Sequence, residues 1–334
     1  MEDRHISLAH GNGGRFMREL IQEVFAKHLA NESLDTRLDA ATLPWTDSRI
    51  VMTTDGFTVQ PLEFPGGNIG SLAVHGTCND LAVAGARPKF LTLNAFIEEG
   101  FDLEVLDRLI ATLAATAREI DVSVVAGDTK VVPRGHGGGL YLATTGVGLL
   151  DPRANLSLDG LREGDRLLVS GPVGDHGIAV MLAREQFGLS GSLLSDAASV
   201  LPFTEAILDL PGLRFMRDPT RGGLVTVCHE LCHVTGMGVR LSEAHVPVQE
   251  QVTSVCQMLG YDPYYLACEG RVVAVLDEGD ADEALARWRA LPGGEQAADI
   301  GSLIGGASRV QMETSIGGSR ILEELEDDPL PRIC

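Results

Sequence analysis

The sequence has no uninterrupted apolar run near the ~20 residues that a membrane-spanning helix requires, so a membrane protein is not expected. Residues 1–5 lack the basic and then apolar pattern of a secretory signal. The six cysteines are too sparse for a disulfide framework, and no two of them are spaced as CxxC. Together these absences predict a cytoplasmic protein.

Basic residues are also scarce, with 26 lysines and arginines against 47 acidic residues and a formal net charge of −21. Such an acidic chain repels phosphate backbones and anionic lipid headgroups, which argues against nucleic-acid and membrane partners. Only three of the basic residues are lysines, namely Lys27, Lys89 and Lys130. A lysine within a candidate site is therefore not simply one of many solvent-exposed charges.

The length of 334 residues and the hydrophobic content of 44% are typical of a globular chain with two domains. Pro152, Gly160 and Gly164 interrupt a polar stretch, which puts the expected domain boundary around 151–164. Apolar periodicity predicts helices at 16–29, 68–84, 103–120, 178–186, 196–209, 222–235 and 280–291, and strands at 50–54, 89–96, 122–126, 140–147, 166–170, 271–276, 298–303 and 309–312.

Five aspartates stand at expected strand ends or helix starts: Asp39, Asp55, Asp80, Asp128 and Asp218. Carboxylates at the ends of buried strands are costly unless they meet a cation, and hard oxygen ligands suit Mg²⁺ that holds polyphosphate. Each aspartate alone is explained as well by a turn or a helix cap. Asp55, Asp80 and Asp128 each adjoin Gly or Asn and each close an apolar run, so together they favour a metal site.

Nucleotide-binding motifs of the common kinds are absent from the sequence. The P-loop pattern GxxxxGK[ST] does not occur, and the glycine spacing over 171–177 is GxxGxxG rather than the dinucleotide fingerprint GxGxxG. One histidine and several glycines near the N-terminus form a short run, His10, Gly11, Gly13 and Gly14. This run could wrap phosphates through backbone N–H groups, and an N-terminus without fixed structure explains it equally well.

The segment from His229 to His233 matches HExxH, the zinc-binding helix of metalloproteases. The extended pattern would require a third histidine at position 239, where this chain has Val239. Two histidines without a third ligand bind metal weakly, so the sequence argues against zinc catalysis.

Cys334 is the last residue, and Pro329 and Pro331 stiffen the segment before it. Counted from an expected hinge at Gly317 and Gly318, this tail could extend by roughly 55–60 Å. At that length Cys334 could reach the active site of its own chain and then that of a second enzyme. The alternative is a chance cysteine on a disordered tail.

Several segments together resemble the HypE family of hydrogenase maturation factors, which is related to aminoimidazole ribonucleotide synthetase, selenophosphate synthetase and thiamine-monophosphate kinase. The segments are LAHGNGG at 8–14, TTDGFTVQPLEFPGGNIGSLAVHGTCND at 53–80, GDTKVV at 127–132, RDPTRGG at 217–223 and PRIC at 331–334. The resemblance covers essentially the whole chain. It implies an α+β fold of PurM-like architecture with a glycine-rich segment and helix at 1–38, an ATP-binding and dimerisation domain at 39–152, a second domain at 153–315 and a flexible tail at 316–334.

The resemblance also implies an ATP-dependent dehydration. A carbamoyltransferase, HypF, would place a carbamoyl group on the Cys334 thiolate, and the chain would convert it to a thiocyanate. The cyanide would then pass to iron held by HypC and HypD for [NiFe]-hydrogenase. The implied cofactors are ATP and Mg²⁺, and the implied oligomer is a homodimer formed through the N-terminal sheets.

The same resemblance suggests roles for individual residues. Asp39, Asp55, Asp80, Asp128 and Asp218 match positions that hold Mg²⁺ and phosphates, and Lys130 would neutralise phosphate charge. Asp80 and Lys130 are therefore also candidates for the catalytic set, with Cys334 and with Glu269 as the proton acceptor near the thiol. The candidate ATP-binding residues are His10, Gly11, Gly13, Gly14, Asp55, Asn79, Asp128, Thr129 and Lys130.

Three alternatives remain open at this point. The first is another ATP-using relative, of the thiamine-monophosphate kinase or selenophosphate synthetase type, which requires no terminal cysteine. The second is a zinc hydrolase built on His229 and His233. The third is a non-catalytic scaffold whose tail docks a partner and whose aspartates are structural.

Overall fold

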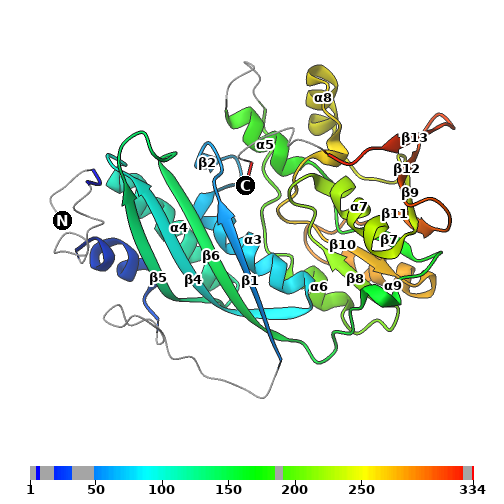
Figure 1. The fold of residues 1–334 in the computed structure, drawn as a ribbon, viewed down its shortest axis with the longest axis horizontal. Helices are drawn as coiled ribbons and strands as arrows, with labels where there is room; N and C mark the ends of the chain where they lie inside the picture. Colours follow the sequence, from blue (N-terminus) through cyan, green and yellow to red (C-terminus); the bar gives the residue numbers. More distant parts are fainter. Residues whose placement is uncertain (1–4, 8–18, 32–48, 185–190, 326–332) are drawn as a thin grey trace.

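The structure is a computed structural model that describes residues 5–7, 19–31, 49–184, 191–325 and 333–334 (Figure 1). The described chain forms two halves, each built on its own sheet, and the fold is α+β as expected. Within the described residues, none of the helices has the length and apolar character needed to cross a membrane.

The N-terminal half is a four-stranded sheet with helices on one face (Figure 1). The strand order is β1 (Ile50–Phe57), β6 (Leu140–Leu150), β4 (Ala86–Glu98) and β5 (Ser123–Val132), with only the last pair parallel. α3 (Ile69–Val83) and α4 (Leu103–Glu119) pack against this sheet. The short elements of this half are η2 (Ile21–Ala26), α2 (Lys27–Leu29), β2 (Glu63–Phe64) and β3 (Gly67–Asn68).

α3 is buried on nearly every side because β1, β6, α4 and a helix of the second half all contact it. Its start is set by Asn68, whose side chain accepts hydrogen bonds from the backbone N–H groups of Gly70 and Ser71. Gly70 permits the close approach of α4, since a Cβ there would lie 2.3 Å from the carbonyl oxygen of Leu109. The start of α3 is thereby fixed against α4.

The C-terminal half is a seven-stranded sheet with helices on both faces. Its strand order is β13 (Ser319–Leu322), β12 (Val310–Glu313), β9 (Gly238–Ser242), β11 (Ala298–Ile304), β7 (Arg166–Val169), β10 (Val273–Leu276) and β8 (Leu213–Arg217). Alternate residues of the central strands face opposite ways. Val169 and Val273 meet α7 (Gly223–Thr235), whereas Leu168 and Ala274 meet α6 (Leu201–Ile207) and α9 (Glu278–Arg289).

The two halves are joined by apolar packing. α5 (Asp175–Ala183) and α8 (Glu250–Leu259) contribute to the same hydrophobic core as the N-terminal sheet and its helices. On the other side, Ala82 and Val83 at the end of α3 pack with α6. The junction between the halves is therefore a packed interface, and the remaining short elements, η3 (Leu158–Gly160) and η4 (Pro263–Tyr265), flank the second sheet.

Every helix and strand predicted from periodicity is present in the described residues, with shifted ends. β1 and β5 continue through Asp55 and Asp128, which we expected to follow the strands, because both residues keep their ladder pairing. Eight elements were not predicted, namely β2, β3, η3, β8, β9, α8, η4 and β13. The expected hinge at Gly317 and Gly318 is the turn of the β12–β13 hairpin, so the sheet extends to Leu322.

The contact between α3 and α4 yields a stability prediction. Gly70→Ala should lower the free energy of unfolding by about 1–3 kcal/mol, because the added methyl group overlaps the Leu109 carbonyl in a packed interface. Chemical denaturation measures the change. Gly160→Ala is the control, since its Cβ would lie no closer than 3.9 Å to Ser157, and an equal loss in both variants would contradict the prediction.

Candidate active site

The last two residues lie at the junction of the two halves, beside β2 and α5 (Figure 1). Ile333 is buried in the N-terminal core, and its carbonyl oxygen accepts a hydrogen bond from His176 Nε2 at 2.7 Å. The carbonyl oxygen of Cys334 accepts bonds from Thr58 N at 3.0 Å and Thr58 Oγ1 at 3.2 Å. The terminal thiol is therefore docked in its own chain.

His176 is set for this contact by its surroundings. Because a carbonyl can only accept, His176 donates from Nε2, and its Nδ1 then accepts from Ser195 Oγ at 2.8 Å. Phe64 stands edge-on to the imidazole. Burial lowers the pKa of His176, so the neutral ring required by this pattern is favoured.

Four carboxylates, Asp55, Asp80, Asp218 and Glu269, interact electrostatically with one another, and two of them, Glu269 and Asp55, also act on the docked thiol. Asp55 lies in β1 on the face turned toward α3, in line with Thr53, whose Oγ1 donates to Asp80 Oδ2 at 2.9 Å. Asp218 follows β8, and Glu269 precedes β10. The site thus takes two carboxylates from each half of the molecule.

The electrostatics of this cluster are unfavourable for negative charge. Burial, reinforced by the charges of Asp80 and Asp55, raises the pKa of Asp218 to about 7. Burial and the charges of Asp218, Asp196, Asp55 and Asp80 raise the pKa of Glu269 well above its usual value. Loss of hydration also raises the pKa of Asp55 and Asp80. Such a cluster attracts a cation.

Glu269 is held firmly, but its side chain is not satisfied. Its N–H donates to Asp196 Oδ1 at 3.2 Å, and its carbonyl oxygen accepts from Asn79 Nδ2 at 3.1 Å. Within the described residues, Glu269 Oε1 is buried without a hydrogen-bond partner. A buried carboxylate oxygen with no donor is expected where a ligand or ion completes the site.

The docked thiol is kept protonated. Burial, together with the charge of Glu269, raises the pKa of Cys334 to about 12, although Arg221, with Nη2 at 3.8 Å from Sγ, acts in the opposite direction. Because the thiolate is the nucleophilic form, Cys334 is a poor nucleophile while docked.

Asp128 and Lys130 lie elsewhere. In β5, Asp128 pairs with Asn94 and Lys130 pairs with Phe96, on the face of the sheet away from α3 and α4. Lys130 Nζ binds Asp128 Oδ2 at 2.7 Å and lowers the pKa of that carboxyl. Within one chain, the sheet separates this pair from Asp55 and Asp80, which we had grouped with Asp128. Thr129 is buried on the opposite, helix-covered face.

Asn79, which the resemblance places among the ATP-binding residues, bonds across the junction of the two halves. Its Nδ2 donates to the carbonyl oxygens of Ala198 and Glu269, and its Oδ1 accepts from Val200 N at 2.9 Å. These bonds join α3 to the second half and position Glu269. The other expected residues, Asp39, His10, Gly11, Gly13 and Gly14, lie outside the described residues.

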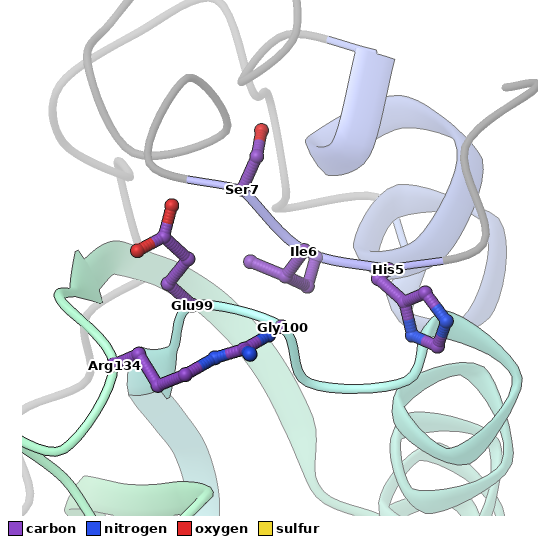
Figure 2. Close-up of a pocket in the computed structure, with 6 residues that line it drawn as sticks. All are labelled: His5, Ile6, Ser7, Glu99, Gly100 and Arg134. Carbon is purple, nitrogen blue, oxygen red and sulfur yellow. The ribbon is translucent and has the colours of Figure 1, made fainter.

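A cleft of about 570 Å³ lies beside residues 5–7. It is lined by His5, Ile6, Ser7, Glu99, Gly100 and Arg134, and Figure 2 shows the Arg134 side chain extended beside Gly100. The cleft contains none of the four carboxylates described above.

The HExxH segment forms the C-terminal part of α7, and its glutamate is bound by an arginine from outside the segment. Glu230 Oε2 binds Arg217 Nη2 at 2.8 Å, whereas His229 Nε2 contacts the carbonyl oxygen of Leu322 at 2.9 Å. The arrangement is unlike a metalloprotease site, where this glutamate acts as general base beside the metal.

Sequence reasoning missed His176, Thr58, Arg221 and Asp196. Arg221 stands in the RDPTRGG segment and Thr58 in the segment that follows β1, so both lay within recognised motifs. His176 and Asp196 carried no such signal, because their roles depend on contacts with Ile333 and Glu269, which are distant in sequence.

The chain matches two family models, "AIR synthase related protein, N-terminal domain" over residues 37–150 and "AIR synthase related protein, C-terminal domain" over residues 162–313. It is 47% identical over 331 residues to carbamoyl dehydratase HypE of Azotobacter vinelandii, an alignment that covers 98% of this chain and 97% of that protein.

Solved structures agree with this result. A hydrogenase maturation protein HypE in complex with ATP is 43% identical, with a TM-score of 0.93 and coverage of 98% of this chain and 100% of that one. HypE in a HypE–HypF complex is 41% identical, with a TM-score of 0.80 over 92% of this chain and 99% of that one. A thiamine monophosphate kinase of Aquifex aeolicus, at 16% identity and a TM-score of 0.60 over 90% of this chain and 98% of that one, shares the fold alone.

Docking of the terminal residues should control the reactivity of Cys334. Ile333→Ala removes a buried side chain whose packing contributes about 2–5 kcal/mol to docking. The variant should therefore be alkylated at Cys334 by iodoacetamide about 10-fold faster or more at pH 8, because the undocked thiol ionises more readily. Peptide mass spectrometry separates Cys334 from the five buried cysteines. Ile321→Ala, at a half-exposed position in β13, is the control, and equal rates in the two variants would refute the role of docking.

Proposed function

The chain belongs to the HypE family of carbamoyl dehydratases, and we propose that its ATP-dependent reaction takes place on a carbamoyl group carried by Cys334. The family assignment rests on two AIR synthase related domains and on full-length similarity to carbamoyl dehydratase HypE. Cys334 docked beside Glu269 is the observation that most directly supports this assignment of the reacting atom.

The reaction converts an S-carbamoyl group, S–C(=O)–NH₂, to a thiocyanate, S–C≡N. One oxygen and two N–H protons leave, which amounts to one water. When bound, Mg²⁺–ATP supplies the phosphoryl group that turns the carbamoyl oxygen into a leaving phosphate. The protein must therefore hold the thioester-like carbon in place and accept protons from nitrogen.

We assign the proton-accepting role to Glu269. It is buried next to Cys334, and its Oε1 is free of hydrogen-bond donors within the described residues. Its raised pKa means that it takes up a proton more readily when the neighbouring carboxylates are uncompensated. A divalent cation among those carboxylates would lower the pKa of Glu269, so that the base is formed only when the nucleotide site is loaded.

Asp55, Asp80 and Asp218 fit the needs of Mg²⁺. This ion is usually bound through one or two carboxylates, with water and phosphate oxygens completing an octahedron, rather than by a closed protein cage. In agreement, these three carboxylates and Glu269 do not form a compact three-ligand group within the part of the chain that the structure describes. Room is thereby left for phosphate oxygens.

The remaining expected ATP ligands enter this proposal in two ways. His10, Gly11, Gly13, Gly14 and Asp39 retain the phosphate- and metal-binding roles expected from the resemblance, and Asp80 and Lys130 retain their catalytic roles. Asp128 and Lys130 lie on the outer face of the N-terminal sheet, which also exposes Met52 and Phe96. We propose that two chains pair through this face as a homodimer, which would bring Asp128 and Lys130, with the backbone of Thr129 between them, toward the partner's nucleotide.

The solved HypE–HypF complex supports HypF as the carbamoyl donor for this chain as well. We further propose that the cyanide passes to a HypC–HypD complex that holds iron and that these exchanges occur in the cytoplasm. Because the docked thiol is protonated, acceptance of the carbamoyl group requires the terminal residues to leave their site.

A variant series tests the carrier and the base. After incubation with HypF, carbamoyl phosphate and ATP, mass spectrometry of the C-terminal peptide should show the carbamoyl adduct minus one water in the wild-type chain. Cys334→Ser should give no thiocyanate. Glu269→Gln should accumulate the carbamoyl adduct and slow dehydration by about 10²–10⁴-fold, the usual contribution of a general base.

Glu323→Gln is the matched control for the acidic change, because its side chain lies outside the cluster. Dehydration by Glu269→Gln at the wild-type rate would refute the assigned base while leaving the family assignment intact. Thiocyanate on another cysteine would refute Cys334 as the carrier.

The requirement for Mg²⁺ should depend on pH. Because the pKa of Asp218 is raised to about 7 in the folded chain, its carboxyl is protonated below that pH and ionised above it. Binding of Mg²⁺ requires the ionised form, so the concentration of Mg²⁺ that gives half-maximal dehydration should be about 10-fold higher at pH 6 than at pH 8. Asp218→Asn should bind Mg²⁺ more weakly and show a smaller pH dependence. An unchanged pH dependence in this variant would contradict the role of Asp218.

A further inference from the structure

A group of metal-type ligands lies outside the site described above. His229 and His233 are four residues apart on α7 and so project from the same side of the helix, with ring centroids 6.3 Å apart. Glu324 stands beside them. Potential ligand atoms of these three residues all lie within 4.8 Å of one another, and no other such group occurs within the described residues.

The third ligand is brought to the helix by the hairpin that the sequence did not predict. β13 pairs with β12 at the edge of the second sheet, and Leu322 at its end is buried in the core beneath α7. The next residue, Glu323, is held by a hydrogen bond from Tyr265 Oη to its carbonyl oxygen at 2.8 Å. Glu324 is therefore positioned by two anchored neighbours.

One pair of the proposed ligand atoms, His233 Nε2 and Glu324 Oε2, lies at a distance close to that of a metal site, and His229 Nε2 is held by a backbone oxygen instead. His233 Nε2 lies 3.1 Å from Glu324 Oε2, and His229 Nε2 lies 2.9 Å from the carbonyl oxygen of Leu322. Two ligands at about 2.0–2.2 Å from zinc, at a tetrahedral angle, are about 3.3–3.6 Å apart. Metal binding through both Nε2 atoms requires each imidazole to carry its proton on Nδ1 and replaces these hydrogen bonds with bonds to the ion.

The donor types select the kind of ion. Two imidazole nitrogens and one carboxylate suit Zn²⁺ and similar borderline ions, whereas Mg²⁺ prefers oxygen ligands alone. Glu230, which would be the general base of a protease, is engaged by Arg217. The group is thus suited to holding an ion and not to hydrolysis.

We propose that His229, His233 and Glu324 bind Zn²⁺ or a chemically similar divalent ion and thereby fix the point from which the C-terminal segment leaves the second domain. Ten residues separate Glu324 from Cys334, which allows a reach of about 33–36 Å when extended. A metal at this position would hold Glu324, at the start of the C-terminal segment, against α7. The start of the same helix follows Arg221, which contacts the Cys334 thiol.

Calorimetric titration of the full chain with ZnCl₂, in excess MgCl₂ to occupy the carboxylate cluster, tests this proposal. We expect one Zn²⁺ per chain. His233→Ala and Glu324→Gln should each weaken binding by at least the ~10–100-fold that loss of even an outer partner costs. Both side chains are largely exposed, so the variants should fold, which far-UV circular dichroism verifies.

The matched controls are His245→Ala, at an exposed position, and Glu323→Gln, and both should bind Zn²⁺ as the wild type does. Amide hydrogen exchange over 319–324 should slow on Zn²⁺ addition in the wild type and not in Glu324→Gln. Absence of Zn²⁺ binding, equal binding in all variants, or loss of binding only in Cys334→Ser would overturn the proposal. None of these outcomes bears on carbamoyl dehydration, which mass spectrometry follows separately.

Discussion

The site depends above all on the mutual repulsion of carboxylates gathered at a domain junction. Asp55 and Asp80 come from the first half, and Asp218 and Glu269 come from the second, so the charge cluster exists only when the halves are packed together. The repulsion opposes that packing, and the buried contacts between α3 and α6 and the hydrogen bonds of Asn79 offset it. What remains is a negative pocket that is neutralised either by protons or by a bound cation. In the proposed reaction, this links metal binding to the formation of the base.

The same electrostatics control the reactivity of Cys334 at the end of the C-terminal segment, which is called the arm below. A thiol beside carboxylates and out of water is kept neutral, which protects it from side reactions but prevents it from accepting a carbamoyl group. Two demands on one sulfur atom are therefore met at two positions, with nucleophilic chemistry assigned to the undocked arm and dehydration to the docked arm. The bonds to Thr58 and His176 involve the backbone of the last two residues, so these contacts do not use the sulfur atom. The same backbone contacts are therefore available to the proposed carrier before and after its thiol is modified.

Much of the fold was predictable from the sequence, since α4 and the strands of both sheets have clear apolar periodicity. The missed strands β8, β9 and β13 are only four or five residues long, too short for a clear apolar pattern. β8 and β9 also pair with strands far away in sequence, whereas β13 forms a hairpin with β12. For the site, motif resemblance led to Asp55, Asp80, Asp218, Glu269 and Cys334, which the structure brings together. It also grouped Asp128 with them, because a strand's end is visible in sequence but the face on which a residue points depends on register.

By itself, the sequence determined the family, the terminal thiol and the acidic residue types, because these are carried by contiguous motifs and by composition. Only the tertiary structure decided which carboxylates share one pocket, that Asn79 holds Glu269 in place, and that Glu324 reaches His229 and His233. Each of these depends on two segments far apart in the chain meeting at a distance of a few ångströms. Hydrogen bonds, charge repulsion and metal coordination all vary steeply over that range, and no local pattern of residues records it.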